Sequence, residues 1–479
     1  MTLHKILSYL DISEVIATSG IAKRWRYTWR GVLILNITAD TTSRFKEKKK
    51  FPGLLNFVDR VFMFRDNSEV NRFKIVLPNC YKGNLMMESI LTWIYALSKR
   101  NVQEIYLEVN NTRLLDFKFP KAKELFHSKS LNKLEMRMTD KELASITFPE
   151  LMCLPQLKLL SLHSFVLSSM DSANNLFASC PVLETLVLDN IDIYITDAHQ
   201  NFVISCSELQ HLEIKSIWYL ESLEFQNSQT TIQKPIHLDV PKLTKFICQD
   251  FLFRENYHFI SDLSSLVTAD VAMFLDETYV ENHVNEYGDK VDEDSAQYSK
   301  LSVEKRDDFA QRMLKLLGSL HAVKELKLSP GVLEVLVGAP GLLDSQPRQF
   351  CNMQYLKLEM WLTGGCACVI TYLLELSPNL ESLYLTLKES NLQDAFDDSE
   401  QRFSRLCVLA HLKSVEISEA KGYDTELKLL EFLLKNGVAL EQLTLHFVYQ
   451  MDRDFEVKIR SLPRASSSID MRFHYPLED

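Results

Sequence analysis

Three stretches of the chain are variants of one pattern: LPQLKLLSLHSF at 154–165, CPVLETLVLDNI at 180–191 and CSELQHLEIKSI at 206–217. Their aligned leucines Leu157, Leu183 and Leu209 are separated by 26 residues each time. Each stretch reads Leu-x-x-Leu-x-Leu or a close variant, and its last two apolar positions alternate with other residues. This period of two is typical of a short β-strand with one buried face.

The same pattern recurs on both sides of these stretches. Further copies begin at Val70, Val102, Leu131, Leu243, Leu266, Val323, Met353, Leu380, Leu412 and Leu440. Spacings of about 20–29 residues are typical of leucine-rich repeats, and longer spacings indicate inserted loops. One repeat cannot bury its apolar face alone, so stacked neighbours must form a continuous core and a parallel sheet. We therefore predict an α/β leucine-rich-repeat solenoid over 60–400, with helices such as SANNLFASC at 172–180 between strands.

Length and charge narrow the functional classes. A chain of 479 residues exceeds the roughly 250–300 residues of a single compact core, which agrees with a repeat architecture. The net charge of −11 does not give the basic footprint of a nucleic-acid-binding protein. No apolar run is long enough for a membrane helix, and no secretory signal is recognisable. We expect a cytoplasmic and/or nuclear protein whose nine cysteines are mostly small buried apolar residues.

Motifs for cofactors and catalysis are missing from the sequence. The chain has 13 glycines and neither a GxxxxGK[ST] nor a GxGxxG loop, so we predict no nucleotide cofactor. Cys366 and Cys368 have no second ligand pair, so we predict no metal site. No GxSxG motif occurs. Spacing alone leaves a Ser–His–Asp or Cys–His constellation open as an enzymatic alternative.

An acidic segment interrupts the repeats at 276–308, where eleven acidic residues accompany four basic ones and few aliphatic residues. Such a segment cannot bury enough apolar surface to offset the entropy of ordering. We predict a mobile insertion that leaves the solenoid. An acidic docking segment is the functional alternative.

The N-terminal stretch ILSYLDISEVIATSGIAKRWRYTWR at 6–30 has a different pattern. Leu3, Ile6, Leu7 and Leu10 follow the i, i+3, i+4, i+7 spacing of one helix face. Ser13 is a plausible N-cap for a second helix, and the segment 22–32 reads as a third. We predict a small three-helix domain at 1–39, which is too small to be stable alone and must pack against the repeats or a partner.

This stretch resembles the F-box of plant F-box/leucine-rich-repeat proteins, whose typical form is ILSFL, a polar turn and AVxTSxLSKRWRxLW. The C-terminal segments CVLAHLKSVEISEAKGYDTELKLLEFLLKNGVALEQLTLHF at 407–447 and LPRASSSIDMRF at 462–473 resemble the FBD module of many plant F-box proteins. We therefore expect an FBD module at 401–479 that continues the solenoid. The usual LPDDLL start of the F-box is missing, so we expect a box shortened at its start.

The resemblance implies a substrate-recognition subunit of a Skp–cullin–F-box type E3 ubiquitin ligase, itself not an enzyme. Its N-terminal helices would bind a Skp-type adaptor, and through it a cullin ligase. The adaptor-facing residues that it implies are Leu3, Ile6, Leu10, Val15, Ile16 and Trp25. The alternative is that some of the apolar side chains of this segment only pack its three helices together. This alternative holds especially for Leu7 and Trp29. A scaffold protein with a non-functional F-box is the alternative function.

The repeats would hold an unknown target protein on the solvent-facing positions of their strands. Candidate target-binding residues are Thr185, Val187, His211, Glu213, Lys357, Tyr384 and Thr386. Some plant leucine-rich F-box proteins resemble hormone sensors, so a small-molecule co-receptor is a further hypothesis. Nucleic-acid binding through KRWRYTWR at 23–30 is a weak alternative in so acidic a chain.

Overall fold

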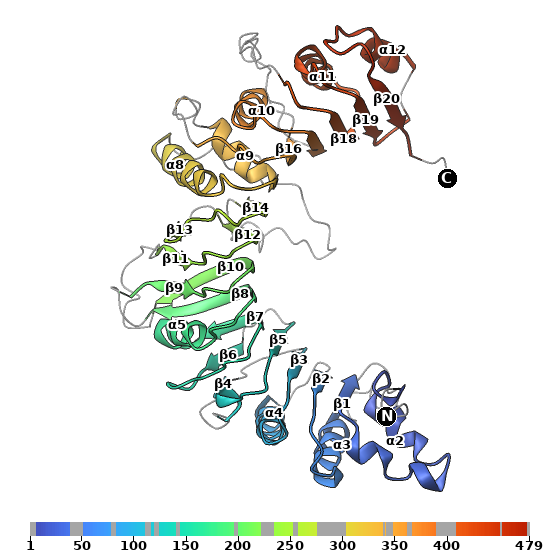
Figure 1. The fold of residues 1–479 in the computed structure, drawn as a ribbon, viewed down its shortest axis with the longest axis vertical. Coiled ribbons are helices and arrows are strands. Elements are labelled where there is room, and N and C mark those ends of the chain that lie inside the picture. The colour runs from blue at the N-terminus through green and yellow to red at the C-terminus, as the bar shows by residue number, and fades with distance from the viewer. Residues whose placement is uncertain are drawn as a thin grey trace. The chain divides into compact units, whose positions relative to one another are not determined.

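The structure is a computed structural model. It describes residues 6–38, 51–77, 83–110, 116–118, 124–139, 144–195, 200–221, 234–251, 257–274, 303–338, 341, 348–361, 366–388, 409–450 and 453–476. The chain divides into two compact units, Met1–Lys242 and Leu243–Asp479, whose elements are labelled in Figure 1.

The first unit is built on a ladder of parallel strands. Successive strands pair in the order β1 (Ile34–Thr38), β2 (Arg72–Leu77), β3 (Glu104–Val109), β5 (Lys133–Met138), β7 (Leu159–Leu167), β8 (Thr185–Ile195) and β10 (His211–Glu221). The shorter strands are β4 (Asp116–Lys118), β6 (Ala144–Thr147), β9 (Phe202–Ser205) and β11 (Ile236–Asp239). β4 pairs with β6, β6 with β7, and β9 with β11.

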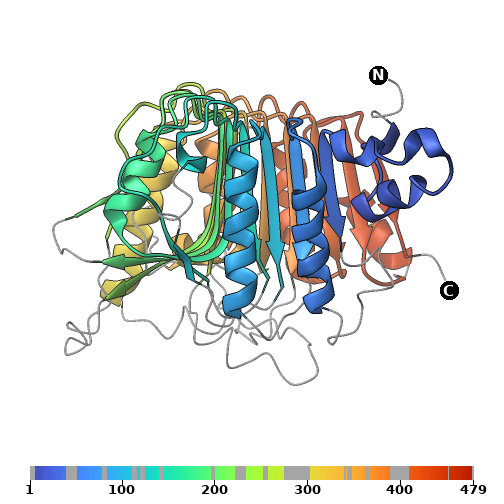
Figure 2. The same ribbon diagram turned by 90° about the horizontal axis from the view of Figure 1, so that it is seen from below.

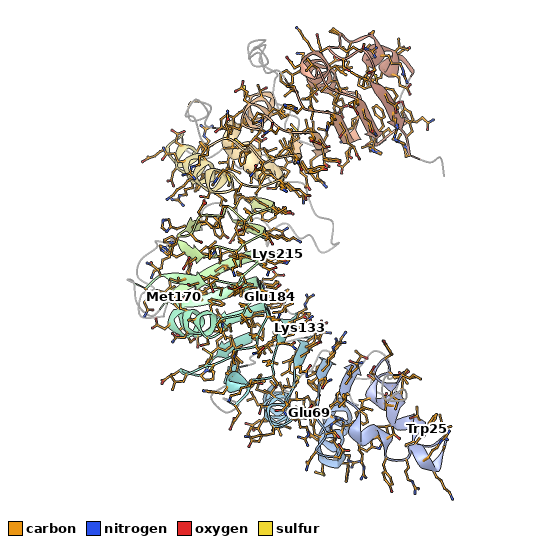
Figure 3. The ribbon with its side chains drawn as sticks, in the orientation of Figure 1. Trp25, Glu69, Lys133, Met170, Glu184 and Lys215 are labelled. Carbon is orange, nitrogen blue, oxygen red and sulfur yellow. The ribbon has the colours of Figure 1, made fainter. Side chains whose placement is uncertain are left out.

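Helices cover one face of this ladder. They are α3 (Phe51–Phe64), α4 (Gly83–Ser98), the 3-10 turn η5 (Leu125–His127) and α5 (Met170–Ala178). Figure 2 shows α3 and α4 running alongside the strands that they cover. In Figure 3, Met170 lies on this helical side, whereas Lys133, Glu184 and Lys215 lie on the opposite side of the sheet. The described helices therefore leave the opposite strand face uncovered.

The second unit repeats this plan with eight consecutively paired parallel strands. They are β12 (Lys245–Phe251), β14 (Thr268–Phe274), β15 (Glu325–Leu328), β16 (Tyr355–Trp361), β17 (Ser382–Lys388), β18 (Ser414–Ala420), β19 (Gln442–Phe447) and β20 (Asp470–His474). The helices are α8 (Val303–Ser319), α9 (Pro330–Val337), α10 (Cys366–Glu375), α11 (Asp424–Asn436) and α12 (Arg453–Ser461), and β13 spans Tyr257–Phe259.

Strand register confirms the predicted repeat and the predicted fold class. Leu160 lies opposite Leu186, and Leu186 opposite Leu212. In the second unit Leu356 lies opposite Leu383 in the same way. All thirteen predicted apolar triplets are at most 3% exposed. Full burial of one such side chain stabilises the fold by about 1.5–3 kcal/mol, so these columns form the continuous core of each unit.

Three neighbouring strands share a bulge that the sequence did not reveal. Ser164, Asn190 and Ser216 have positive φ values of 61°, 54° and 50°. Asn190 Nδ2 donates to Ser164 Oγ at 3.2 Å. Leu188 and Ile191, three residues apart, are both fully buried. The bulge thus restores the apolar face after two consecutive outward residues, which lets β7, β8 and β10 run for 9–11 residues.

The N-terminal segment differs from the predicted three-helix domain. Only Ile6 and Leu7 of the first expected helix lie in helical conformation among the described residues, and α2 spans Ile12–Thr18. The expected third helix is replaced by two 3-10 turns, η1 (Lys23–Trp25) and η2 (Thr28–Gly31). A segment this short, rich in aromatic residues and with Gly31 at its end, gains too little from helix propagation. A three-helix F-box is therefore not confirmed.

The cap of α2 also differs from the prediction. Asp11, not Ser13, is the N-cap: its Oδ1 accepts from the Ser13 amide at 2.9 Å. Glu14 Oε2 accepts from the Asp11 amide at 3.1 Å, which completes a capping box. Asp11 rather than Ser13 is the cap because the Asp11 carboxylate can also accept a hydrogen bond from the neighbouring strand.

Two predicted boundaries differ from the bounds of the elements in the structure. The ladder begins with β1, inside the predicted helical domain 1–39 and before the predicted solenoid start at 60. An unrecognised triplet, Val32, Leu35 and Ile37, is buried there. Of the predicted insertion 276–308, residues 276–302 lie outside the described residues, whereas 303–308 begin α8. Those polar residues are helical because Asp308 pairs with Arg312 at 2.6 Å and the following turns bury Phe309 and Met313.

Candidate functional site

The N-terminal segment is fastened to the first strand of the ladder. Thr38 donates its amide to Asp11 Oδ2 at 2.8 Å, and Asn36 Nδ2 donates to the Ser8 carbonyl at 3.2 Å. Asp11 is buried. One carboxylate therefore caps α2 and accepts from β1, and this fixes the helix relative to the strand.

The buried side chain of Arg65 holds α3 against the same segment. Its Nη2 donates to the carbonyl of Val32, just before β1, and to the carbonyl of Glu69 at 2.9 Å. Burial lowers the pKa of Arg65 to about 10, and the neighbouring charge of Asp66 acts in the opposite direction. The guanidinium remains charged at neutral pH, so these charge-assisted bonds persist.

The predicted adaptor-facing residues differ in how much of each side chain is exposed to solvent. Ile6 is 60% exposed, and Leu10, Ile16 and Trp25 are half-buried. Val15 is only 2% exposed and packs inside the segment, so its side chain is not available for contact in this structure. It lies on the side of α2 that faces the core, together with the fully buried Ile12. Leu3 lies outside the described residues.

Sequence reasoning missed other exposed apolar side chains in this segment. Tyr9, Ile21 and Tyr27 are all well exposed. The arginines contact aromatic rings: Arg30 lies over Tyr27 at 4.6 Å from the ring centroid, and Arg24 over Trp25 at 5.7 Å. Figure 3 places Trp25 at the outer end of the segment. The surface thus combines large apolar side chains with arginines, which is typical of interface anchors.

The predicted target-binding residues line up across neighbouring strands. In the first unit Thr185 lies opposite His211, and Val187 opposite Glu213. In the second unit Lys357 lies opposite Tyr384. Thr386 lies opposite Glu359 in the same strand pair. The register therefore gathers each set into lateral rows on the face of its own unit, and the two sets belong to different units.

A chain of three polar residues crosses the face of the first unit. Ser161 Oγ lies 2.8 Å from His163 Nε2, and His163 Nδ1 lies 3.1 Å from Asp189 Oδ2. Burial raises the pKa of Asp189, but the His163 contact and the charges of Lys215 and Arg137 outweigh it, so that pKa is lower than usual. Sequence reasoning missed these three residues. The signal that could have found them is the strand register, which brings residues 26 positions apart side by side.

This arrangement has the connectivity of a Ser–His–Asp triad but lacks other parts of a catalytic site. Ser161 is 5% exposed, so little room is left for a substrate carbonyl. β7 is paired on both sides around Ser161, so its amides serve the ladder rather than an oxyanion hole. We therefore interpret the three residues as a structural hydrogen-bond chain that fixes the polar surface of this face.

Ion pairs fix further side chains on this face. Lys215 Nζ lies 2.6 Å from Glu213 Oε1, and Arg72 Nε lies 2.6 Å from Glu104 Oε2. Lys74 lies over the ring of Tyr106 at 5.0 Å from its centroid. Such partly exposed pairs contribute little to stability, but they order the side chains that a partner would meet.

The face of the second unit has its own charged centre. Lys327 Nζ lies between Asp270 Oδ2 at 3.5 Å and Glu359 Oε1 at 3.1 Å. Burial lowers the pKa of Lys327, but the two carboxylates outweigh it and the pKa is raised. Towards the C-terminus, His446 stacks on His474 with ring centroids 4.7 Å apart. This face therefore offers both signs of charge beside aromatic rings.

Within the described ranges, no group of three or more His, Cys, Asp or Glu side chains could hold a metal ion. Cys368 carries a free thiol. No helix in the described part of the chain is long and apolar enough to cross a membrane. Cys180, Cys206 and Cys248 are buried as predicted for the cysteines, whereas Cys153 and Cys351 are exposed.

The fold and its repeats define a leucine-rich-repeat protein, and comparison with known proteins identifies its relatives. The family model for the leucine-rich repeats of FBD-associated F-box protein At5g56370 matches residues 90–258, and the FBD model matches residues 403–445. F-box/FBD/LRR-repeat protein At5g44980 of Arabidopsis thaliana is 24% identical over 93% of this chain and 91% of its own length. FBD-associated F-box protein At5g22730 of the same plant is 26% identical over 97% and 90%.

These matches confirm the resemblance to plant F-box/FBD/leucine-rich-repeat proteins that the sequence predicted. The FBD match falls on the repeats of the second unit that contain β18, α11 and β19, so this module continues the strand ladder.

Proposed function

We propose that this protein is the substrate-recognition subunit of a Skp–cullin–F-box type E3 ubiquitin ligase and has no catalytic role of its own. Its relatives are named as F-box proteins, which supports a Skp-type adaptor as partner and, through it, a cullin ligase. We expect it to act in the cytoplasm and/or the nucleus. Its contribution would be proximity, because holding a target near the loaded enzyme raises the effective concentration of the reacting groups.

The apolar surface of the N-terminal segment is the observation that carries this proposal. Ile6, Tyr9, Ile21 and Tyr27 are exposed within a segment of about two dozen residues. Exposed large apolar side chains that gather in one segment are typical of interaction sites. The Asp11 bonds hold the segment on β1, so an adaptor that binds it would be rigidly attached to the repeats.

We propose that the target binds the strand faces, which none of the described helices of the same unit covers. Polar and aromatic side chains lie there in lateral rows, and ion pairs order several of them. The candidates Thr185, Val187, His211, Glu213, Lys357, Tyr384 and Thr386 all occupy these rows.

Co-purification with a plant Skp-type adaptor tests the adaptor half of the proposal. The test variant combines Ile6→Asp with Trp25→Ala, because the exposed Ile6 and the half-buried Trp25 both belong to the N-terminal segment that we propose as the docking surface. The matched control is Val457→Asp, which places the same charge on an exposed apolar position of α12 in the other unit. We expect stoichiometric binding by the wild-type chain and the control, and loss of binding in the test variant.

A scaffold whose F-box-like segment does not bind the adaptor is the second candidate function. The departure from a three-helix F-box favours it, since η1 and η2 replace the third helix. Failure of the wild-type chain to bind the adaptor, with an unchanged circular dichroism spectrum, would support the scaffold and contradict the ligase proposal.

A further inference from the structure

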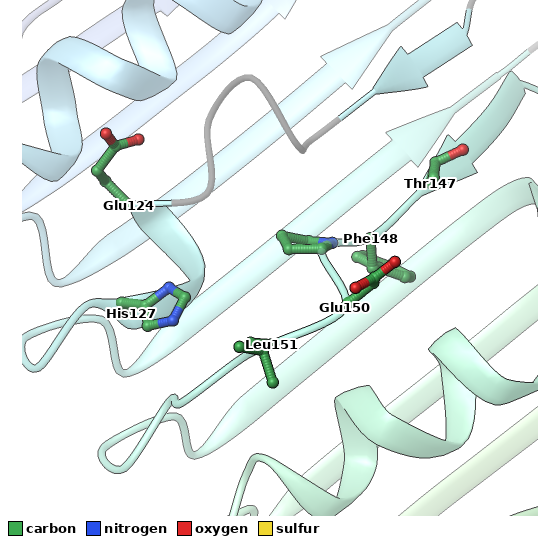
Figure 4. Close-up of a pocket in the computed structure, with 7 residues that line it drawn as sticks. Glu124, His127, Thr147, Phe148, Glu150 and Leu151 are labelled. Atoms are coloured by element: carbon green, nitrogen blue, oxygen red, sulfur yellow. The ribbon is translucent and has the colours of Figure 1, made fainter.

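A pocket of about 640 Å³ opens in the first unit between η5 and the segment that follows β6. Its lining residues are Glu124, His127, Thr147, Phe148, Pro149, Glu150 and Leu151. Figure 4 shows Glu124 and His127 on one side and Glu150 and Leu151 on the other. None of these residues belongs to the docking surface or the strand rows discussed above, so the proposed function does not account for the pocket.

The pocket has an apolar floor that is firmly built. Phe148 is buried and packs edge-on against the fully buried Phe126, with ring centroids 5.5 Å apart. The Cys153 amide donates to the Phe126 carbonyl at 2.7 Å, which ties the two walls together. Leu151 is 77% exposed at the opening. An exposed leucine above an aromatic floor is suited to contact an apolar side chain from another molecule.

Two of the polar lining residues are acidic, beside His127 and Thr147. Glu124 and Glu150 line the same opening, and within the described residues neither carboxylate has an ion pair or a hydrogen bond from its side chain. Within the described ranges both carboxylates are therefore unpaired, in contrast to the paired carboxylates of the strand faces. A ligand that places a cation here gains an ion pair without breaking an existing one.

We propose that this pocket binds a peptide segment in which an apolar side chain is flanked by lysine or arginine. The apolar side chain would enter against Phe148 and Leu151, and the basic side chains would meet Glu124 and Glu150. Charge complementarity selects a basic peptide over an acidic one, and the apolar floor selects a peptide over a simple polycation. The inference does not depend on adaptor binding or on the strand faces.

Fluorescence anisotropy with three labelled heptapeptides tests the proposal on the full-length chain. The probe is Gly-Ser-Arg-Leu-Arg-Ser-Gly. One comparison peptide replaces both arginines with glutamate, and the other replaces the leucine with serine. We expect the probe to bind at least about tenfold more tightly than either comparison peptide, and its affinity to fall as salt is added.

Charge reversal then locates the site. The double variant Glu124→Lys, Glu150→Lys should weaken probe binding at least about tenfold. Glu431→Lys is the matched control and should leave binding unchanged, because Glu431 is an exposed glutamate on α11 of the other unit with no side-chain partner among the described residues. Leu151→Ser alters only an exposed side chain, so it should weaken the probe without affecting folding.

Three results would overturn the proposal. The first is no saturable binding of the probe up to about 1 mM. The second is equal affinity for the acidic peptide, and the third is undiminished binding to the double variant and to Leu151→Ser. Because the adaptor is absent from this assay, failure here leaves the proposed ligase function standing, and failure of adaptor co-purification leaves this site standing.

Discussion

The cores of the two units are built from the same repeat pattern, but the segments between the repeats differ. In both, Leu-x-x-Leu-x-Leu triplets stack in register and are almost fully buried. In the first unit, the described residues include four short strands besides the ladder strands and helices, whereas in the second unit α8, α9, α10 and α11 alternate with ladder strands. The apolar triplets therefore set the stacking, and the segments between them are free to vary.

Each unit also contains a buried carboxylate that accepts backbone amides. In the first unit Asp11 accepts from Ser13 and Thr38. In the second unit Glu426 accepts from the amides of Lys421 at 3.0 Å and Gly422 at 2.9 Å, where Gly422 has a φ of 82°. Both side chains fix a helix start against a strand end. The two units therefore stabilise the same kind of junction with different residues.

The largest expected effect is common to both cores. Leu186→Ala in the first unit and Leu383→Ala in the second remove fully buried side chains at equivalent positions. Each should lower the free energy of unfolding by about 2–5 kcal/mol, because a cavity is left between stacked repeats. Urea denaturation followed by circular dichroism measures this. Val187→Ala, on the strand face, is the control and should cost less than about 1 kcal/mol. A negligible effect of either leucine substitution would break the equivalence of the units.

The second-largest loss of stability is expected for the replacement of Glu426. Replacement by alanine leaves two amides without acceptors and should cost about 1–3 kcal/mol. Burial raises the pKa of Glu426 more than its hydrogen bonds from the amides of Lys421 and Gly422 lower it. A carboxyl with a raised folded pKa stabilises the fold below its unfolded pKa, and this contribution is lost as the pH rises through the folded value.

Glu426→Gln separates these two contributions. The amide side chain keeps an acceptor oxygen and carries no charge, so at pH 7 the variant should be at least as stable as the wild-type chain. Thermal unfolding between pH 4 and pH 7 measures this. A strong loss of stability at pH 7 in Glu426→Gln would show that the charge itself stabilises the turn.

A smaller and local effect is expected at Asp11. Asp11→Ala removes the cap of α2 and the acceptor of the Thr38 amide, which should cost about 0.5–2 kcal/mol. Hydrogen exchange should become faster over residues 6–38 and stay unchanged in the second unit. Asp11→Asn keeps an acceptor and should have a weaker effect. Faster exchange throughout the chain would contradict a local role.

A still smaller effect concerns the pH dependence of the first unit. The pKa of Asp189 is lowered, so its contribution is present above its unfolded pKa and is lost as the pH falls through the folded value. Because Asp189 is partly exposed, the contribution should stay below about 1 kcal/mol. Asp189→Asn should flatten the acid limb of the stability profile. An unchanged acid limb would mean that the His163 contact is not maintained in solution.

Cysteine reactivity tests the packing of the repeats without any substitution that changes the stability of the protein. Cys153 in the first unit and Cys351 in the second are exposed, whereas burial raises the pKa values of Cys180 and Cys206 to about 12. Alkylation at pH 8 followed by mass spectrometry should modify the exposed pair quickly and the buried pair only in denaturant. Rapid labelling of Cys180 would contradict the packing of its repeat.

The sequence was sufficient for the fold because the repeat signal is local and redundant. The thirteen triplets could be found by spacing alone, and strand pairing then followed from stacking. Val32, Leu35 and Ile37 were missed because Val32 ends a segment read as helical and the other two follow directly on it. The bulges at Ser164, Asn190 and Ser216 were missed because positive φ at non-glycine residues leaves little trace in a single sequence.

The candidate sites were less predictable because they depend on exposure and on contacts between repeats. A helical pattern places Val15 and Ile6 among apolar residues but does not say which of them faces the core. The Ser161–His163–Asp189 chain arises from a register of 26 residues, which only the stacked strands make visible. The acidic pocket depends on the wall formed by η5, which has no marked sequence signature.

The most direct test of the central claim is hydrogen–deuterium exchange of the full-length chain with and without a plant Skp-type adaptor. We expect slower exchange on adaptor binding within residues 6–31, which contain Ile6 and Trp25, and unchanged exchange in the strands of the repeats. The strand faces would then remain free for a target protein. Protection confined to the repeats, or no protection at all, would contradict the claim that the N-terminal segment docks on the adaptor.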